Sequence, residues 1–470
     1  LVCSEMCIRD RQGIILSGEK LPSKRALAKN LAISVITVEN AYGQLLAEGY
    51  IYSIPKSGYY VSDLSGIPVH QTEYTSETYE AEEQGTDSRT AKAGDKVLLT
   101  GGENAFIADF TSNQTEHAAF PFSIWNKTMR AVMNDYQKEM MINPPCGGVM
   151  ELRKSISSYL KEFCAMYVRP EQIIIGAGTE YLYSILIQLL GRNVCYGVEN
   201  PGYPKIAKIY RSMGVKYEYI DLDEEGTSAK KLEEKKVDIM HISPSHHFPT
   251  GMVMPISKRY ELLGWVTRKK ERYIIEDDYD SELRLAGKPI PSLQSIDVSG
   301  KVIYINTFAK TLCSTVRISY MVLPEALAEK YYRELSFYSC TVSNFEQYTL
   351  AAFMNAGAFE KHINRLRNYY QHKRDLILST FLKEPLGKYI TISEEDSGVH
   401  FLMHVNTSMS EQEFLLKTRA KGIRLATLSS FYNAEQKDSR YENTYVMNYS
   451  FVDCDRLEYV AQTLYKIIHP

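Results

Sequence analysis

The sequence predicts an α/β protein in which a short N-terminal winged helix-turn-helix is followed by a larger domain with a mostly parallel sheet. Short apolar segments alternate with amphipathic helical segments over residues 105–470, a pattern typical of parallel strands covered by helices on both faces. Residues 12–62 differ, because two helical segments there precede two short strands around a turn. With 470 residues, 44% hydrophobic and 24% charged, the chain has the composition of a globular protein with two or three domains.

The N-terminal pattern is a helix, a turn, a second helix and a hairpin. Ser23 and Ser34 each precede apolar residues at helical spacing, and a serine hydroxyl there accepts a backbone N–H of the first turn. Residues 50–53 and 59–61 are rich in tyrosine and flank a turn that contains proline and glycine. We therefore expect a winged helix whose second helix enters the major groove of DNA.

The candidates for DNA contact are polar and basic residues at the starts of both helices and at the tip of the hairpin. Hydroxyl and cationic groups suit phosphate oxygens, while Thr37 and Asn40 are placed to reach base edges. The same residues also fit a solvated helix surface or a winged helix that binds another protein. The full set is Ser23, Lys24, Arg25, Ser34, Thr37, Asn40, Lys56, Ser57 and Gly58.

The segment between the two parts has a different composition. From Asp63 to Val97 there are eight acidic and three basic residues with few aliphatic ones, which predicts a flexible linker. The predicted boundaries are 1–62 for the winged helix, 63–104 for the linker and 105–470 for the larger domain, with a small α+β subdomain over about 370–470.

Reactive side chains gather at the predicted strand ends of the larger domain. Lys310 follows the apolar segment 302–306, and Arg317 comes seven residues later. Upstream, residues 273–279 predict a buried strand that ends in carboxylates and a phenol, Asp277 and Tyr279 among them, with 272–275 as its apolar part. Because ligands in parallel sheets bind at the carboxyl ends of the strands, we expect these side chains to converge there.

Their chemistry suits pyridoxal phosphate. A lysine amine deprotonated by burial and nearby cations can form a Schiff base with the coenzyme aldehyde. The Asp277 carboxylate would keep the pyridine nitrogen protonated, and Tyr279 could hydrogen-bond the ring oxygen. Arg317 offers the phosphate a fixed, bidentate counter-charge.

Two further elements complete the expected coenzyme site. Gly178 and Thr179 lie where a strand meets a helix, and the backbone N–H groups of a helix start bind phosphate. Tyr203 could stack on the ring. Taken singly, the residues have simpler explanations: a solvated lysine, a surface ion pair for Arg317, and a metal site or helix cap for Asp277 with Asp278. Their order and joint placement favour the coenzyme.

Longer stretches resemble known families. Residues 12–62 resemble the GntR winged-helix family, and residues 105–470 resemble fold-type I pyridoxal phosphate enzymes of the class I aminotransferase group; together they resemble MocR/GabR regulators. The stretches concerned include Lys20–Ala28, Ala47–Ile51, Phe120–Trp125, Glu199–Pro204, Pro244–Gly251, Glu276–Asp280 and Lys310–Arg317. The resemblance implies that Lys310 is the Schiff-base lysine, that Asp277 and Tyr279 contact the ring nitrogen and oxygen, and that Gly178, Thr179, Thr307 and Arg317 hold the phosphate.

The chain departs from these families in its ligand pocket. Phe248 stands where aminotransferases carry an asparagine that hydrogen-bonds the ring, and Lys205 stands where some relatives have an arginine. Residues 444–450 contain no arginine for a substrate carboxylate. We therefore expect an altered ligand, or no external amino acid at all. Lys205 and Arg424 are the effector-binding candidates, with Arg440 as the alternative to Arg424.

The beginning of the chain also departs from the GntR pattern. The family has another helix before Gly13, whereas residues 1–11 here begin at Leu1 and resemble a translated sequencing adapter. We expect these residues to be non-native and the winged helix to be incomplete at its N-terminus.

The prediction for function is a cytoplasmic transcription regulator that binds operator DNA as a homodimer and senses pyridoxal phosphate or a small amine or amino acid. The alternatives are a working aminotransferase with a vestigial DNA-binding domain and a coenzyme-buffering protein without DNA binding. The eight cysteines are scattered without zinc-site spacing, so no metal is expected. No apolar run is long enough to cross a membrane, and no signal peptide is visible.

Overall fold

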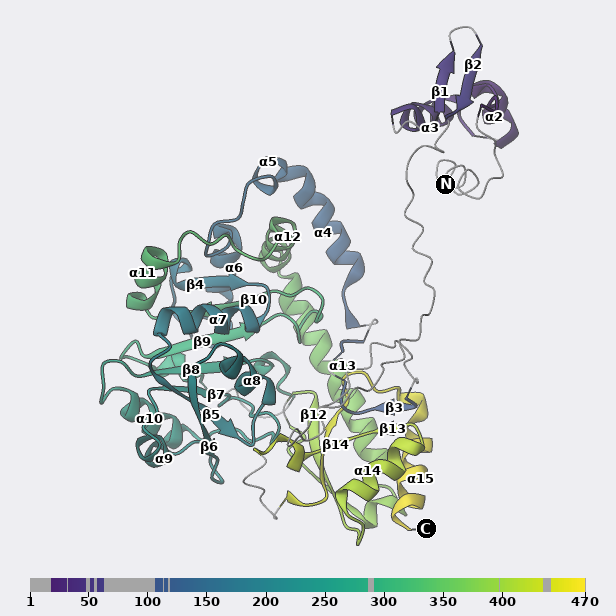
Figure 1. Cartoon of the computed structure of the whole chain (residues 1–470). Helices are drawn as coiled ribbons and strands as arrows, with labels where there is room; N and C mark the ends of the chain where they lie inside the picture. The colour runs from purple at the N-terminus through teal and green to yellow at the C-terminus, as the bar shows by residue number, and fades with distance from the viewer. Residues whose placement is uncertain are drawn as a thin grey trace, which may run out of the picture. The chain divides into compact units, whose positions relative to one another are not determined.

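The chain divides into two compact units, residues 1–99 and 100–470. The computed structural model describes residues 18–31, 33–47, 51–54, 57–62, 106–112, 114–116, 119–285, 291–396, 398–433 and 441–469. Figure 1 labels the helices and strands of both units. The linker predicted at 63–104 and the segment 1–11 lie outside the described residues, so these predictions and the exact domain boundaries stay predictions.

The first unit has the elements expected of a winged helix. They are α2 (Lys24–Leu31), α3 (Val35–Ala47), β1 (Ile51–Ile54) and β2 (Gly58–Val61), and the two strands form an antiparallel hairpin. Ser23 Oγ accepts the N–H of Ala26 at 3.2 Å, and Ser34 Oγ accepts the N–H of Thr37 at 3.1 Å, so both serines cap their helices as predicted.

A small apolar core holds the first unit together. Val38, Tyr42 and Leu45 lie on one face of α3 and pack with Leu21 and Ala28, and the hairpin adds the buried side chains Ile51 and Val61. The Tyr42 hydroxyl donates to the carbonyl of Pro22 at 2.8 Å, which ties α3 to the residue before α2. The opposite face of α3 is left exposed.

The second unit is built on a mostly parallel sheet. Within the described residues, seven strands are ordered β4-β10-β9-β8-β7-β5-β6, and β10 alone runs antiparallel to its neighbours. Their bounds are β4 (Ile173–Gly176), β5 (Cys195–Asn200), β6 (Lys216–Asp221), β7 (Ile239–Ile242), β8 (Tyr273–Asp278), β9 (Val302–Thr307) and β10 (Ser319–Val322).

Helices cover both faces of this sheet, as the alternating pattern predicts. Alternate residues of each strand point to opposite faces: Ile303 and Ile305 pack against α7, α8 and α11, whereas Tyr304 packs on the side of α6 and α12. The helices are α4 (Phe122–Asp135), α5 (Gln137–Met140), α6 (Met150–Cys164), α7 (Thr179–Leu190), α8 (Pro204–Ser212), α9 (Ala229–Glu234), α10 (Ile256–Val266), α11 (Glu325–Glu334) and α12 (Asn344–Asn355).

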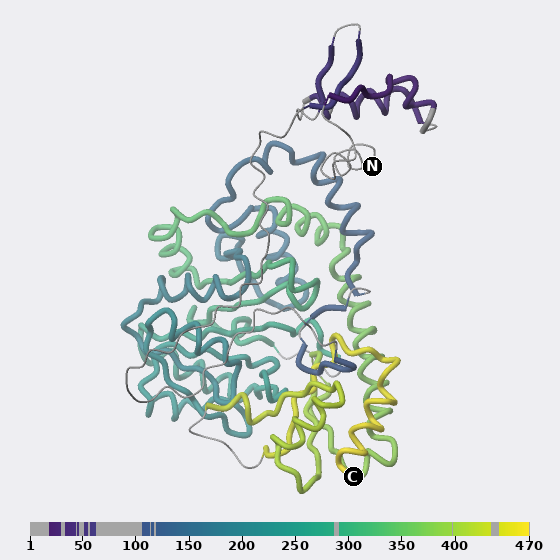
Figure 2. Tube along the Cα trace, turned by 45° about the vertical axis from the view of Figure 1, so that its right-hand side comes forward, coloured from purple at the N-terminus to yellow at the C-terminus, as the bar shows by residue number. Residues whose placement is uncertain are grey.

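A smaller antiparallel sheet follows near the C-terminus. Its described strands are ordered β11-β12-β15-β14, with bounds β11 (Ile390–Ser393), β12 (His400–Val405), β14 (Ala426–Thr427) and β15 (Thr444–Asn448). It packs with α13 (Ala358–Phe381), α14 (Glu411–Ala420) and α15 (Leu457–Ile468). In Figures 1 and 2 the long helix α13 extends from α12 to this sheet and so links the two parts of the unit.

The C-terminal part also includes the first described residues of the second unit. β3 (Ala108–Asp109) pairs in parallel with β13 (Ile423–Arg424), and Phe110 is buried in the core of the small sheet. The sequence pattern did not show this pairing, because more than 300 residues separate the two strands.

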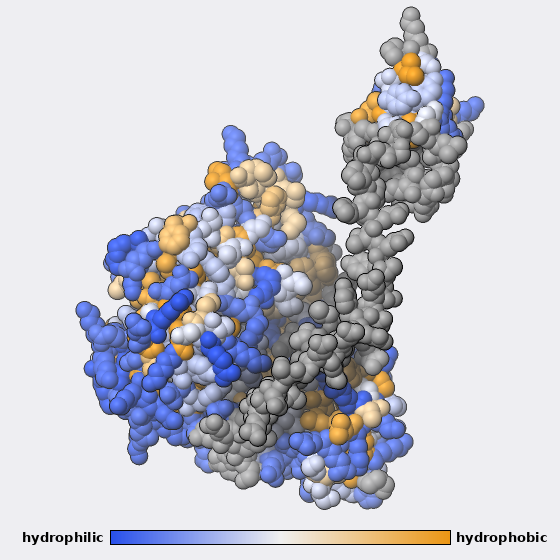
Figure 3. Space-filling view, viewed as in Figure 1, coloured by the Kyte–Doolittle hydropathy of each residue, from blue (hydrophilic) through white to orange (hydrophobic). Residues whose placement is uncertain are grey.

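The visible face of the unit in Figure 3 is mostly hydrophilic with scattered hydrophobic side chains. No helix among the described residues combines the length and apolarity needed to cross a membrane.

The strand β8 places the carboxylates of the site. It ends in carboxylates as the segment 273–279 predicts, and it runs to Asp278, beyond the narrower candidate strand 272–275. Buried partners make this possible: Glu276 accepts the backbone N–H groups of Leu293 and Gln294, at 2.7 and 2.8 Å, and Asp278 accepts the hydroxyl of Tyr304 at 2.7 Å. Hydrogen-bonded carboxylates can be buried where unpaired ones cannot.

Candidate functional site

A cavity of about 260 Å³ lies at the carboxyl ends of the parallel strands. Its walls come from the segment after β4, from the ends of β5, β7, β8 and β9, and from the start of α8. The lining includes all of the predicted coenzyme residues and the predicted effector residue Lys205; the coenzyme residues are Gly178, Thr179, Tyr203, Asp277, Tyr279, Thr307, Lys310 and Arg317. The order of the strands thus brings candidates from distant parts of the sequence around one cavity.

Asp277 is a buried carboxylate in the lining of the cavity. Its Oδ2 accepts a short hydrogen bond from the Tyr183 hydroxyl and lies 3.5 Å from His241 Nε2. His241 is held in turn by the Tyr210 hydroxyl, 2.9 Å from Nδ1. Asp277 Oδ1 is buried and has no hydrogen-bond partner among the described residues. A buried acceptor without a partner is costly, so this oxygen fits a ligand N–H.

Lys310 lines the same cavity, just beyond the end of β9. Burial lowers the pKa of its amine below the ordinary value, and the negative charge of Asp280 acts in the opposite direction. A lowered pKa increases the share of neutral, nucleophilic amine at neutral pH. Lys310 therefore has the chemistry of a lysine that bonds to an aldehyde.

Tyr279 lies beside a buried histidine and acid. The Tyr279 hydroxyl is 3.2 Å from His246 Nδ1, which is 2.9 Å from Asp280 Oδ2. Burial raises the pKa of the Tyr279 phenol well above its ordinary value, so the hydroxyl keeps its proton. The backbone of Gly398, at φ +67°, approaches so closely that a Cβ there would lie 2.3 Å from the His246 ring.

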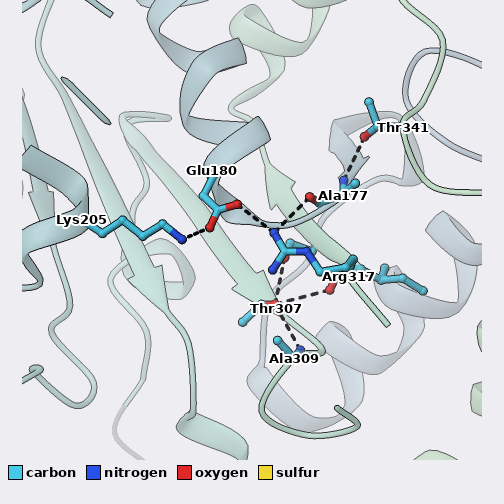
Figure 4. Close-up of polar contacts among 9 residues, drawn as sticks. Ala177, Glu180, Lys205, Thr307, Ala309, Arg317 and Thr341 are labelled. Atoms are coloured by element: carbon cyan, nitrogen blue, oxygen red, sulfur yellow. Dashed lines mark hydrogen bonds and ion pairs between the residues drawn. The ribbon is translucent and has the colours of Figure 1, made fainter. Parts of the chain in front are cut away.

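The other end of the cavity is suited to an anion. Gly178 has φ +94°, and a Cβ on it would lie 2.1 Å from Arg317 Nη2, so the guanidinium packs directly on the glycine at the start of α7. Thr307 Oγ1 accepts the N–H of Ala309 at 3.2 Å and the hydroxyl of Ser319 at 2.8 Å. Figure 4 shows Arg317 and Thr307 facing the same region. A helix start, hydroxyl groups and a guanidinium form a phosphate-binding arrangement.

A carboxylate joins the two cations at this end. Glu180, in the first turn of α7, accepts a hydrogen bond from Lys205 and pairs with Arg317 Nη2 at 2.8 Å (Figure 4). Neither Glu180 nor the buried residues Tyr183 and His241 were among the sequence candidates. The helical spacing of Thr179 and Tyr183, four residues apart, is the signal that places Tyr183 on the same helix face.

Aromatic residues form the outer wall. Phe248 packs edge-on against Tyr203, His400 and Phe431, with ring centroids 5.1–6.0 Å apart. Glu199 lines the cavity with its side chain 8% exposed; burial raises its pKa to about 8. Phe248 thus contributes packing at the position where aminotransferases carry a polar amide.

Arg424 lies elsewhere, contrary to its expected effector role. It is not among the residues that line the cavity; its guanidinium is 3.4 Å from Asp109 and lies over the ring of Phe106. The pairing of β13 with β3 carries Arg424 to this position. The residues of β15 are buried and include no arginine. Arg440, the alternative to Arg424, lies outside the described residues.

The predicted DNA-contact residues of the first unit are mostly exposed. Arg25, Ser34, Thr37 and Asn40 are solvent-accessible, and the Ser34 and Thr37 hydroxyls are 2.8 Å apart. Lys24 pairs with Glu39 at 2.7 Å. At the hairpin tip, Ser57 Oγ is 2.6 Å from the Tyr60 hydroxyl, and Gly58 has φ +127°. Lys56 lies outside the described residues.

Both units match family models. Residues 107–440 match the aminotransferase class I and II family, and residues 9–61 match the bacterial regulatory proteins of the gntR family. Among solved structures, the chain resembles the kynurenine aminotransferase of Pyrococcus horikoshii (22% identity, 78% of this chain and 91% of that chain, TM-score 0.66). It also resembles an archaeal alanine:glyoxylate aminotransferase (21% identity, 77% and 90%, TM-score 0.67). At these identities the likeness shows the fold.

Relatives with both units cover nearly the whole chain. The uncharacterized HTH-type transcriptional regulator YdeL of Bacillus subtilis is 38% identical over 90% of this chain and 87% of that protein. The HTH-type pyridoxine biosynthesis regulator PdxR of Corynebacterium glutamicum is 27% identical (96% and 91%), and the probable rhizopine catabolism regulatory protein MocR of Rhizobium meliloti is 28% identical (89% and 83%). The chain therefore belongs to the MocR-type transcriptional regulators, which join a GntR-type helix-turn-helix to an aminotransferase class I and II domain.

Proposed function

We propose that this regulator binds pyridoxal phosphate in the described cavity. It senses either the coenzyme itself or a small amine or amino acid that enters the cavity. The observation that carries the proposal is Asp277 Oδ1, which is buried at the cavity wall without a partner among the described residues. A protonated pyridine nitrogen supplies the missing donor. Lys310 and Arg317 line the same cavity, suited to the aldehyde and the phosphate.

Each group of cavity residues contacts a different part of the proposed coenzyme. Asp277, fixed by Tyr183, orients the ring; Tyr279 offers its phenol to the ring oxygen; and Tyr203 covers one ring face. Gly178, Thr179, Thr307 and Arg317 bind the phosphate. When bound, the coenzyme supplies an aldehyde that combines with amines and a ring that accepts electrons. Lys205 remains the candidate for contact with an effector.

The first experiment tests the covalent attachment. Titration of the full chain with pyridoxal phosphate should produce the visible absorbance of a lysine adduct, and Lys310→Ala should abolish it. Lys301→Ala is the matched control, because Lys301 lies at the opposite end of the same strand and is not part of the cavity lining. An adduct that persists in Lys310→Ala would refute the assignment.

The second part of the proposal concerns DNA. We infer that the winged helix binds operator DNA within a homodimer in the cytoplasm, where Thr37 and Asn40 reach bases and Ser34 contacts phosphate. Binding of fragments from the region flanking its own gene should weaken with rising salt. Thr37→Ala with Asn40→Ala should reduce specific affinity by about 1–3 kcal/mol per lost base contact. The exposed Lys127→Ala, on α4, serves as the control.

Ligand and DNA binding are coupled only if two arrangements of the protein differ in affinity for the ligand. Saturating pyridoxal phosphate should therefore change the operator dissociation constant, and Lys310→Ala should remove that change. An operator affinity that is the same with and without coenzyme would refute sensing. Sustained turnover with amino-acid and keto-acid pairs would instead favour the aminotransferase alternative.

A further inference from the structure

Glu180 is placed where it competes with a bound phosphate. Its Oε2 is 2.8 Å from Arg317 Nη2, and its Oε1 accepts a hydrogen bond from Lys205 (Figure 4). The same Nη2 atom lies against Gly178 at the start of α7 and 3.5 Å from the Ala177 carbonyl. A phosphate held by this helix start and by Arg317 must share that donor with the Glu180 carboxylate.

The Glu180 side chain remains negatively charged under ordinary conditions. Its pKa lies below the usual value, mainly because Lys205 donates a hydrogen bond to it and in smaller part because Lys205 and Arg317 carry positive charge. Its position in the first turn of α7 also favours an anion through the helix dipole. Protonation therefore does not remove this carboxylate from the phosphate region near neutral pH.

The Glu180 carboxylate lowers the net positive charge at the phosphate end of the cavity. Lys205 and Arg317 supply two positive charges at this end of the cavity, and Glu180 cancels one of them. All three side chains are between 37% and 49% exposed, so solvent screens the repulsion without abolishing it. The remaining attraction for a phosphate dianion is weaker than the guanidinium and the helix start alone would provide.

We propose that Glu180 is a built-in competitor for the phosphate-binding arginine, which lowers the affinity of this cavity for phosphorylated ligands and keeps their binding reversible. The inference rests on the proposed function. A sensor must release its ligand when the ligand concentration falls, whereas an enzyme can keep its coenzyme bound. An anion beside the guanidinium favours such release. Lys205 moderates the competition because Glu180 shares its negative charge between Lys205 and Arg317.

The test compares ligands with and without a phosphate. The full-length wild-type chain and Glu180→Gln are titrated with pyridoxal phosphate and with pyridoxal, following the visible absorbance of the lysine adduct. Glu180→Gln should bind pyridoxal phosphate about three- to tenfold more tightly, as expected for removing a partly screened charge, and pyridoxal unchanged. Glu325→Gln is the matched control, since Glu325 is also in the first turn of a helix and pairs with an arginine, Arg169, at 3.2 Å.

The outcomes distinguish a wrong role for Glu180 from a wrong proposal for coenzyme binding. Unchanged or weaker binding of pyridoxal phosphate by Glu180→Gln, or an equal gain for pyridoxal, would overturn the role of Glu180. Failure of the wild-type chain to form the adduct at all would overturn the proposed function instead.

A second variant measures the part played by Lys205. Lys205→Met should weaken the binding of pyridoxal phosphate more when it is made in the wild-type chain than when it is combined with Glu180→Gln. The reason is that the carboxylate without Lys205 keeps Arg317 as its remaining cationic partner and competes more strongly for it, whereas the neutral amide does not. Equal effects of Lys205→Met in both proteins would contradict the competition.

Discussion

The two ends of the cavity are built differently, although both serve one proposed ligand. The Asp277 side chain is 9% exposed and is fixed by the buried residues Tyr183 and His241. The Arg317 side chain is 49% exposed and is paired with Glu180, itself held by Lys205. The buried end is held by its hydrogen-bond partners and leaves one acceptor for the ligand, whereas the exposed end has its donor already paired with Glu180.

This difference suggests that one end of the cavity recognises the ligand and the other end determines how long the ligand stays bound. A buried carboxylate in a low-dielectric surrounding has a strong and specific interaction with a single N–H. An exposed ion pair is screened and exchanges its partners at low cost. We infer that the Asp277 end selects the ring and that the Arg317 end sets how long a phosphorylated ligand stays.

The largest effect is expected at the buried end. Asp277→Asn removes the charge that faces the ring nitrogen while its amide oxygen can still accept from Tyr183. The affinity for pyridoxal phosphate and for pyridoxal should fall equally, by about tenfold to a hundredfold, the range of a hydrogen bond to a charged group. Asp238→Asn is the control, because Asp238 precedes β7 at the amino ends of the strands, opposite to the cavity. A loss confined to the phosphorylated ligand would erase the distinction between the two ends.

A smaller and more selective effect is expected at the exposed end. Arg317→Lys keeps the charge but loses the planar guanidinium, so pyridoxal phosphate should bind about tenfold more weakly and pyridoxal should be unaffected. Equilibrium titration of both ligands measures the ratio. Arg333→Lys offers a matched control, since Arg333 is an exposed arginine that pairs with Glu334 at 3.1 Å. If pyridoxal binding fell as well, Arg317 would be a structural support of the whole cavity.

Sequence reasoning found the residues that face the proposed ligand at both ends of the cavity and missed those that hold them, Tyr183 and His241 at one end and Glu180 at the other. Lys310 and Asp277 are chemically unusual at the ends of apolar strands, so strand order alone brought them together. Glu180 was missed because an acid in the first turn of a helix is an ordinary feature. Arg424 was misplaced because its position depends on the distant pairing of β13 with β3.

The boundaries of the strands were less predictable than their order. β8 extends beyond the narrower candidate strand 272–275, because distant groups satisfy Glu276 and Asp278 within the strand. Such partners cannot be recognised from local sequence. The winged helix was easier, because Ser23 and Ser34 cap their helices through contacts three residues away.

The buried Glu199 carboxyl in the cavity wall should also make the stability of the protein depend on pH. Burial raises the pKa of Glu199 to about 8, above its ordinary value, so the folded state holds a proton that the unfolded chain releases from about pH 4.5 upward. Its contribution to stability is therefore fully present below about pH 4.5 and is lost as the pH rises toward 8.

Glu199→Gln should remove this loss, making the variant about 2 kcal/mol more stable relative to wild type at pH 8 than at pH 6. Chemical unfolding of both proteins at the two pH values measures the difference. The neighbouring His247 does not reverse the sign, since burial lowers its pKa to about 3 and it stays neutral throughout. A parallel pH profile for variant and wild type would place the Glu199 carboxyl in contact with solvent.

The smallest effect tests whether the fixed position of Asp277 matters by itself. Tyr183→Phe removes the hydroxyl that donates to Asp277 Oδ2 and keeps the ring that packs edge-on against His241. Without this bond the carboxylate is less well oriented, and both pyridoxal phosphate and pyridoxal should bind about two- to fivefold more weakly, a typical net value for one hydrogen bond. Tyr181→Phe, two residues earlier on α7, is the control, because its buried hydroxyl has no partner among the described residues. Equal titration curves for Tyr183→Phe and wild type would mean that burial alone, rather than the hydrogen-bond network, prepares Asp277 for the ring.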